Sequence, residues 1–261
     1  MSRIQAALAD RGGRLALIAY VTVGYPTLEA TPGLVRSLSR AGVDMIELGI
    51  PFSDPLADGP TIQAASQAAL RQGVTVSHAI VAARAARALS QLPILFMSYL
   101  NPILAFGIER FCREAVAAGV DGLIVPDLPP RDAGELRQAA LAAGLDLVFF
   151  VSPLSPVERI EEAGEASTAF IYCLAVTGIT GARAQLDPGV LPMIERVRAL
   201  TSRPVVVGFG ISRPEHLQAL AGKADGAIVA SALLDAIARA PDDPEQAARD
   251  FVMHLRQPAP G

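Results

Sequence analysis

The chain has 261 residues, of which 51% are apolar, and a formal net charge of −4. The apolar fraction is ample for a large core, and the acidic balance provides no basic footprint for binding nucleic acid. Its two cysteines, Cys112 and Cys173, lie within apolar patterns, which favours buried thiols over a disulfide or a metal site. This cysteine usage suits a reducing cytosol, so we expect a cytoplasmic protein.

No stretch of the sequence is typical of a membrane span. Residues 1–13 have a short amphipathic pattern that ends in glycines, without the apolar core of a signal peptide. The longest uncharged run, residues 88–108, is interrupted by Pro93, Asn101 and Pro102, which favours a strand followed by a loop. We therefore expect a soluble protein that does not associate with membranes.

Eight short strand-like runs follow one another along the chain, and helical Ala/Leu/Arg patterns lie between them. The runs are 15–24, 44–50, 93–99, 121–127, 145–151, 169–175, 203–210 and 225–231. The interval between the second and third runs is the longest and has room for two helices, at about 61–72 and 75–90. Several helical patterns end at a glycine, which is a helix C-cap signal. Two closing helices, SALLDAIAR and AARDFVMHLRQ, follow the eighth run.

These strand–helix units continue without a linker or a break in composition. They predict one α/β domain over residues 1–261, a single (β/α)8 TIM barrel with extra N-terminal and closing helices. The alternative is an open, doubly wound sheet, but such a sheet usually has fewer strands. No GxGxxG motif follows the first run, which further disfavours a dinucleotide-binding sheet.

The stretch ELGIPFSDPLADGPTIQ, residues 47–63, joins the end of the second run to a turn-rich loop. If residues 44–50 form a strand, alternation puts Met45, Glu47 and Gly49 on one face and only apolar residues on the other. A strand that is apolar apart from one carboxylate is typical of a buried parallel strand. A buried carboxylate is costly unless it is paired or takes part in function, and the residues alone leave both interpretations open.

Other residue types narrow the chemistry. The only lysine, Lys223, precedes the eighth run and so lies at the end of the barrel opposite to the expected active site. Schiff-base chemistry therefore has no candidate amine. All three histidines lie in helical patterns away from strand ends, so no zinc site is expected. A magnesium site at Glu47, Asp54 and Asp58 has no support beyond the residue types, and we expect no metal.

Of the kinds of catalysis considered, proton transfer by carboxylates is the one for which the sequence has candidate residues. The polar residues at the predicted strand ends are Glu47, Asp58, Tyr99, Asn101, Asp127, Tyr172 and Thr180. We expect a raised pKa for Glu47 in apolar surroundings, whereas Asp58 in a wetter loop stays ionised. The alternative for Asp54 and Asp58 is an ordinary role in a turn. If the reaction breaks a carbon–carbon bond, the substrate must supply its own electron sink, because the protein offers no imine.

Three turns rich in glycine or serine follow the last three strand-like runs. They are TGITG (177–181), GFGIS (208–212) and Ala230–Ser231 at the start of a helix. The second turn continues into a capping-box pattern, with Ser212 as N-cap and Glu215 at N3. Such turns and helix N-termini present backbone N–H groups to anions, and barrel enzymes often bind phosphate after strands seven and eight. Each turn alone is more typical of a plain loop, but together they predict a phosphate site.

The assembled residues closely resemble the tryptophan synthase alpha chain family, from about Gln5 to about His254. The stretches that carry this resemblance are YVTVGYP (20–26), ELGIPFSDPLADGPTIQ (47–63), MSYLNPI (97–103), PDLPP (126–130), TGITG (177–181) and GFGIS (208–212). The resemblance implies a lyase of tryptophan biosynthesis that cleaves indole-3-glycerol phosphate to indole and glyceraldehyde 3-phosphate without a cofactor in this chain. It also implies a pyridoxal-phosphate beta chain as partner, in an α2β2 heterotetramer.

The resemblance also implies roles for individual residues. Glu47 would be the general acid–base, and Asp58 would stabilise the protonated indole ring. Tyr20, Met97, Tyr172, Thr180 and Phe209 would contact the substrate; Gly181, Gly210, Ala230 and Ser231 the phosphate; and Pro51, Phe52, Asp54 and Asn101 the beta chain. Thr180 would reach Asp58 when loop 177–190 closes as a lid. Phe52 packing down within its own loop is the alternative to a partner contact.

One position departs from the family pattern. Family members usually have glycine where this chain has Ala230, and the added methyl group would crowd the phosphate.

Two other functions are alternatives to this one. The first is another phosphate-binding barrel of the same pathway, such as an isomerase or indole-glycerol-phosphate synthase. The synthase would need a catalytic lysine at a strand end, and none is present. A silent subunit that only activates a beta chain would not need both Glu47 and Asp58.

Overall fold

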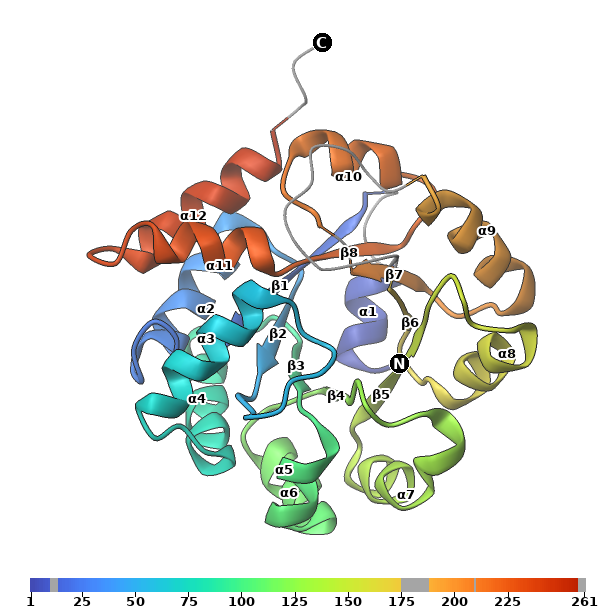
Figure 1. Cartoon of the computed structure of the whole chain (residues 1–261), viewed down its shortest axis with the longest axis horizontal. Coiled ribbons are helices and arrows are strands. Elements are labelled where there is room, and N and C mark those ends of the chain that lie inside the picture. Colours follow the sequence, from blue (N-terminus) through green and yellow to red (C-terminus); the bar gives the residue numbers. More distant parts are fainter. Residues whose placement is uncertain (10–13, 175–187, 209, 258–261) are drawn as a thin grey trace.

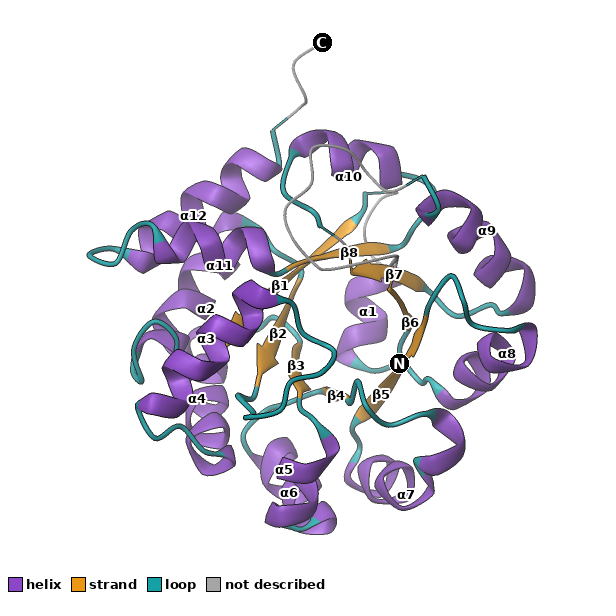
Figure 2. Cartoon of the chain, viewed as in Figure 1, coloured by secondary structure: helices purple, strands orange, loops and turns teal. Residues whose placement is uncertain are grey.

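The computed structural model describes residues 1–9, 14–174, 188–208 and 210–257. Within these ranges, eight parallel strands form a closed barrel in sequence order, with β1 paired to β8. Helices surround the strands on the outside (Figures 1 and 2). The predicted (β/α)8 barrel is therefore confirmed.

Each strand lies within the run predicted for it. The strands are β1 Ala16–Thr22, β2 Met45–Gly49, β3 Ile94–Met97, β4 Gly122–Ile124, β5 Asp146–Val151, β6 Ile171–Leu174, β7 Val205–Gly208 and β8 Gly226–Val229. All of them are rich in apolar residues, because in a parallel barrel one face of a strand packs on the helices and the other on the barrel interior.

The helices also follow the predicted plan. They are α1 Arg3–Ala9, α2 Ala30–Ala41, α3 Pro60–Arg71, α4 Val76–Leu89, α5 Leu100–Phe106, α6 Ile108–Ala117, α7 Gly134–Ala143, α8 Val157–Ala166, α9 Val190–Leu200, α10 Pro214–Leu220, α11 Ser231–Ala238 and α12 Pro244–Leu255. Two helices lie between β2 and β3, and α11 and α12 close the chain, as predicted. Helices α2 and α7 end at left-handed Gly42 and Gly144. None of the described helices is both long and apolar enough to cross a membrane.

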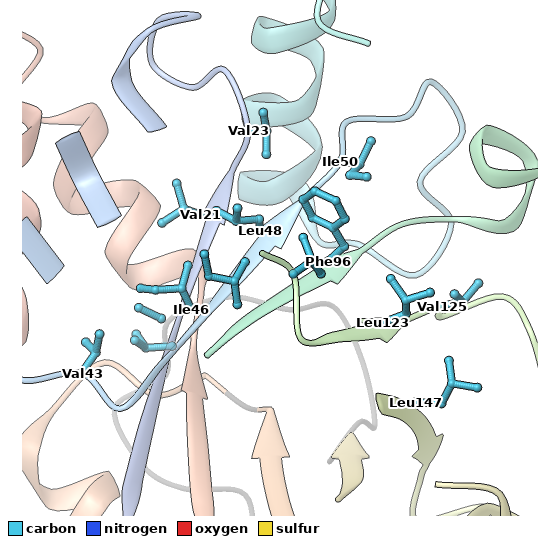
Figure 3. Close-up of a cluster of buried hydrophobic side chains, with 14 of the residues drawn as sticks. Val21, Val23, Val43, Ile46, Leu48, Ile50, Phe96, Leu123, Val125 and Leu147 are labelled. Atoms are coloured by element: carbon cyan, nitrogen blue, oxygen red, sulfur yellow. The ribbon is translucent and has the colours of Figure 1, made fainter. Parts of the chain in front are cut away.

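Alternation along the strands produces two hydrophobic cores. The larger core lies between strands and helices and contains Ile46, Leu48 and Ile50 of the β2 region (Figure 3). The smaller core fills the barrel interior and contains Met45 of the same strand. The predicted division of β2 into two faces is thus confirmed, and it places Glu47 on the interior face. Cys112 and Cys173 are free and buried in the larger core, also as predicted.

Helix α1 closes the barrel at the amino-terminal ends of the strands. Its side chains Ile4 and Leu8 are buried in the interior core. Gln5 of the same helix donates a 2.9 Å hydrogen bond from Nε2 to the carbonyl of Thr168, the residue just before the sixth strand region. Apolar side chains therefore fill this end of the interior, and its polar residues gather at the other end.

Candidate active site

Glu47 projects from the middle of β2 into the barrel interior. In register, it lies between Tyr20 of β1 and Leu95 of β3, and its exposed fraction is 0%. Both carboxylate oxygens are without a hydrogen-bond partner among the described residues. A buried polar group usually has such a partner, so Glu47 is a candidate for contact with a ligand.

Burial raises the pKa of Glu47 to about 8, and the nearby charge of Asp58 contributes to the same direction. A carboxyl group in this environment favours the neutral form, because little water or positive charge stabilises the anion. At neutral pH, Glu47 therefore carries a proton that it can donate. The raised pKa expected from the sequence is confirmed in direction.

Asp58 lies in the loop between β2 and α3 and is half-buried. Burial raises its pKa to about 6, and a hydrogen bond from the hydroxyl of Tyr99 acts in the opposite direction. Asp58 is more buried than the sequence suggested, but with a pKa of about 6 it remains mostly ionised at pH 7. The charge of Asp58 acts on Glu47, so the two carboxylates lie near enough to influence each other's protonation. One protonated and one ionised acid at a single site is a typical arrangement for acid–base catalysis.

The loop that carries Asp58 is fixed by hydrogen bonds on both sides of this residue. The N–H of Asp58 donates to the carbonyl of Pro55 at 3.0 Å. Gln63 of α3 donates from Nε2 to the carbonyl of Asp58 at 2.8 Å. The N–H of Ala57 donates to the hydroxyl of Tyr99 at 2.9 Å. The position of the carboxylate is therefore set by the fold before any ligand binds.

Tyr99 contacts the loop that carries Asp58, and the sequence gave it no role. It is buried directly after β3, and its hydroxyl binds two consecutive residues of the neighbouring loop, Ala57 and Asp58. Its ring contacts that of Phe52, with centroids 5.4 Å apart. The only sequence signal was its place at a strand end in the motif MSYLNPI.

Aromatic side chains line the interior around the two acids. Tyr20 and Tyr172 are buried in the interior core, and Met97 packs against it. Burial raises the pKa of both tyrosines well above its ordinary value, and the charges of Glu47 and Asp58 add to this. The structure therefore places these three predicted substrate contacts in the interior core that also surrounds Glu47, and their side chains offer apolar surface to a ligand.

Close approach of Tyr172 to the neighbouring strand requires a glycine. A Cβ atom at Gly208, the last residue of β7, would overlap the ring and hydroxyl of Tyr172. Tyr172 also contacts the ring of Phe150 on β5, with centroids 4.5 Å apart. Because residue 208 has no side chain, the Tyr172 ring can lie against the end of β7.

The described part of the predicted phosphate site consists of Gly210, Ala230 and Ser231. Gly210 has a φ of +25°, in the region that favours glycine. Ala230 is the N-cap of α11, and Ser231 is the first residue of that helix. All three lie after β7 or β8, at the same end of the barrel as Asp58. The predicted residues Thr180, Gly181 and Phe209 lie outside the described residues.

The capping box predicted at Ser212 and Glu215 is wrong. Helix α10 begins at Pro214, its N-cap is Arg213, and no side chain makes a capping hydrogen bond there. Proline is well suited to the first helical position, because its φ is fixed and its missing N–H needs no partner, so the helix begins one residue later than predicted. The N–H of Ser212 donates instead to Nδ1 of His216 at 3.2 Å.

The residues expected to face a partner differ in their exposure. Asp54 and Asn101 are exposed, whereas Pro51 is buried and Phe52 is half-buried against Tyr99. The ring of Phe52 contacts Tyr99, which follows β3, and not a residue of its own loop, so the contact with a partner stays a prediction. Leu56, which the sequence did not single out, is 94% exposed in the same loop. A leucine this exposed beside polar residues suits a docking surface.

Together, the fold and the two acids define a class: a TIM-barrel enzyme that transfers protons with carboxylates at the carboxyl ends of its strands. No group of three or more potential metal ligands occurs among the described residues. The family model for the tryptophan synthase alpha chain matches residues 6–259. The chain belongs to the tryptophan synthase alpha chain family.

Relatives and solved structures agree with this assignment. The tryptophan synthase alpha chain of Roseiflexus sp. (strain RS-1) is 49% identical, and the match covers 98% of this chain and 100% of that protein. The alpha chain of Chloroflexus aggregans is 48% identical, with 93% and 92% covered. Among solved structures, Mycobacterium tuberculosis tryptophan synthase gives a TM-score of 0.90 at 37% identity, with 97% and 96% covered. The subunit alpha from Legionella pneumophila gives 0.91 at 34% identity, with 98% of each chain covered.

Members of this family are lyases of tryptophan biosynthesis. The alpha chain cleaves indole-3-glycerol phosphate, and the released indole passes to the beta chain.

Proposed function

We propose that this chain carries out the family's retro-aldol cleavage with Glu47 as the acid–base and Asp58 as the anion that stabilises the protonated ring. The observation that supports the proposal is the fully buried Glu47, whose oxygens have no hydrogen-bond partner among the described residues, near Asp58 and Tyr172. Neither a lysine nor a cofactor of this chain takes part, so the indole ring itself accepts the electrons of the broken bond.

In the first step, protonated Glu47 donates its proton to indole C3. This carbon becomes tetrahedral, and the ring becomes an iminium cation with its positive charge centred on the ring nitrogen. Asp58 lies where its negative charge opposes that developing positive charge. Electrostatic stabilisation of this kind is strongest in a site that excludes water.

In the second step, ionised Glu47 removes the proton from the hydroxyl group on the carbon attached to C3. The oxygen forms a carbonyl double bond to that carbon, the carbon–carbon bond to C3 breaks, and its electron pair neutralises the iminium ring. The products are indole and glyceraldehyde 3-phosphate, and Glu47 has regained its proton. The same residue thus serves as acid and then as base, which a pKa of about 8 allows at neutral pH.

The other predicted residues hold the substrate. Tyr20, Met97 and Tyr172 enclose the indole ring, and Thr180 and Phe209 complete this set by resemblance. Backbone groups of Gly181, Gly210, Ala230 and Ser231 bind the phosphate, with support from the N-terminus of α11. We further propose that residues 1–261 act as one catalytic domain in the cytoplasm. The beta partner carries pyridoxal phosphate and docks at Pro51, Phe52, Asp54 and Asn101.

The test is indole release from indole-3-glycerol phosphate by the purified chain, with and without a tryptophan synthase beta chain. We expect release by the parent and its loss in Glu47→Gln, which keeps the shape of the side chain but cannot transfer the proton. Asp54→Asn, assayed without the beta chain, is the matched control, because it removes an exposed carboxylate from the adjacent loop. Near-parental activity of Glu47→Gln would overturn the assignment. A parent that activates the beta chain but releases no indole itself would indicate a silent subunit.

A further inference from the structure

His216 is a buried histidine to which the proposed cleavage assigns no role. It is the third residue of α10, and its side chain is 3% exposed. Nδ1 of its ring accepts a 3.2 Å hydrogen bond from the backbone N–H of Ser212, so the ring hydrogen is on Nε2. Nε2 is buried and has no hydrogen-bond partner among the described residues. An apolar side chain would fill this space without leaving a donor unpaired, so packing alone does not explain a histidine here.

The turn that His216 reaches belongs to the predicted phosphate site. It joins β7 to α10 and includes Gly210, which is exposed and has a φ of +25°. The next residue, Ile211, is 2% exposed and packs in the larger core. Ser212 follows and donates its N–H to the ring of His216. The two residues after Gly210 are therefore fixed, one by packing and the other by a hydrogen bond.

A second histidine shows what the same kind of hydrogen bond does in ordinary helix capping. His78 is the third residue of α4, and its Nδ1 accepts a 3.2 Å hydrogen bond from the N–H of the N-cap, Thr75. This histidine is exposed, and the side chain of Thr75 completes a capping box. His216 reaches one residue further back, past the N-cap Arg213 to Ser212. Its hydrogen bond therefore holds the turn before the helix and not the helix end.

We propose, on the basis of the function proposed above, that His216 is a positioning residue for the phosphate group of the substrate. Its ring binds the N–H of Ser212 and fixes the turn, so that Gly210 presents its backbone N–H to the phosphate. A binding group whose position is set in advance loses less free energy to ordering when the ligand binds. His216 touches no reacting atom, so it should affect substrate affinity and not the chemical step.

The test uses two variants that separate the acceptor from the volume of the ring. His216→Phe keeps a ring of similar size without an acceptor, whereas His216→Asn keeps an acceptor near the position of Nδ1 in a smaller side chain. We expect His216→Phe to raise KM for indole-3-glycerol phosphate and Kd for glycerol 3-phosphate by about five- to tenfold. Its kcat and its affinity for indole, which has no phosphate, should stay close to the parental values. His216→Asn should remain within about twofold of the parent in all four quantities.

His78→Phe is the matched control, because it removes the same kind of hydrogen bond from a helix outside the proposed phosphate site. It should leave both affinities, KM and kcat unchanged. Steady-state kinetics and calorimetry would measure these quantities. If the phenylalanine ring at position 216 prevents folding, His216→Met takes its place, because its flexible side chain also lacks a strong acceptor.

The loss of affinity must follow the acceptor and not the volume. Impairment of His216→Asn equal to or greater than that of His216→Phe would overturn the role of His216. Equal losses of affinity for indole and for glycerol 3-phosphate would also overturn it, because they would indicate a general packing defect. Calorimetry needs no turnover, so this result is independent of catalysis. Absence of indole release by the parent would instead overturn the cleavage assignment itself.

Discussion

The hydroxyl of Tyr99 accepts a 2.9 Å hydrogen bond from the backbone N–H of Ala57, the residue directly before Asp58. The same hydroxyl donates to the Asp58 carboxylate and holds its pKa below the value that burial alone would give. One side chain at the end of β3 therefore sets both the place and the protonation state of the acid on the neighbouring loop.

Replacing Tyr99 by Phe should shift the activity profile of the resting enzyme. Without the donor, the pKa of Asp58 rises above about 6, so more of the residue is protonated near neutral pH. We expect kcat/KM to fall about tenfold at pH 6, with a smaller loss at pH 7.5. The measurement is kcat/KM for indole release from pH 5 to 9. A uniform loss at every pH would indicate a packing defect instead.

The parent enzyme should have a bell-shaped pH profile. Asp58 must be ionised, so activity is lost as the pH falls through about 6. Glu47 must be protonated to begin the reaction, so activity is lost as the pH rises through about 8. Because the two acids interact, the apparent values belong to the pair. Rate measurements under single-turnover conditions would check this, and a profile that rises continuously to pH 9 would contradict the proton donation by Glu47.

Asp58→Asn should slow the chemical step more than it weakens substrate binding. An amide keeps the size of the side chain but cannot oppose the positive charge that develops on the ring. The expected loss in kcat is about 10²–10³-fold, typical for removal of one electrostatic stabiliser of a transition state. Steady-state kinetics of the chain without a beta chain would measure it, with Asp54→Asn as the exposed control on the same loop. A kcat within a few-fold of the parent would exclude this role.

Glu47→Gln should be more stable than the parent at alkaline pH. Burial raises the pKa of Glu47 from 4.5 to about 8, so the folded protein binds more protons than the unfolded chain between these values. Parental stability from this residue is therefore fully present below pH 4.5 and is lost as the pH rises through about 8. The difference should approach a few kcal/mol, on the order of 4 at most. Urea unfolding at pH 5 and pH 8.5 would measure it, and equal differences at both would contradict the buried, unpaired state.

Ala230→Gly should improve binding of the phosphate group. Ala230 is the N-cap of α11, and an anion bound at this helix N-terminus would meet its methyl group. Removing it should lower KM for indole-3-glycerol phosphate by about threefold or more, because a crowded contact is relieved. The affinity for indole, which has no phosphate, should not change. Equal effects on both ligands, measured by calorimetry, would place the benefit elsewhere.

Much of this architecture follows from local sequence patterns. The two faces of β2, and with them the burial of Glu47, follow from strict alternation in a parallel strand. The contacts of Tyr99 could not be predicted in this way, because they depend on how closely the loops after β2 and β3 approach each other. The same is true of Phe52, whose ring packs against Tyr99. At α10, two local signals competed, and the proline outweighed the capping box.

Helix α1 closes one end of the barrel interior. Ile4 and Leu8 fill the amino-terminal end of the interior, so we expect a product formed beside Glu47 to leave at the carboxyl-terminal end. The loops at that end carry three exposed residues, Asp54, Leu56 and Asn101. A beta chain bound at this end of the barrel would receive the indole where it leaves the alpha chain. The alpha chain would then need no channel of its own to deliver it.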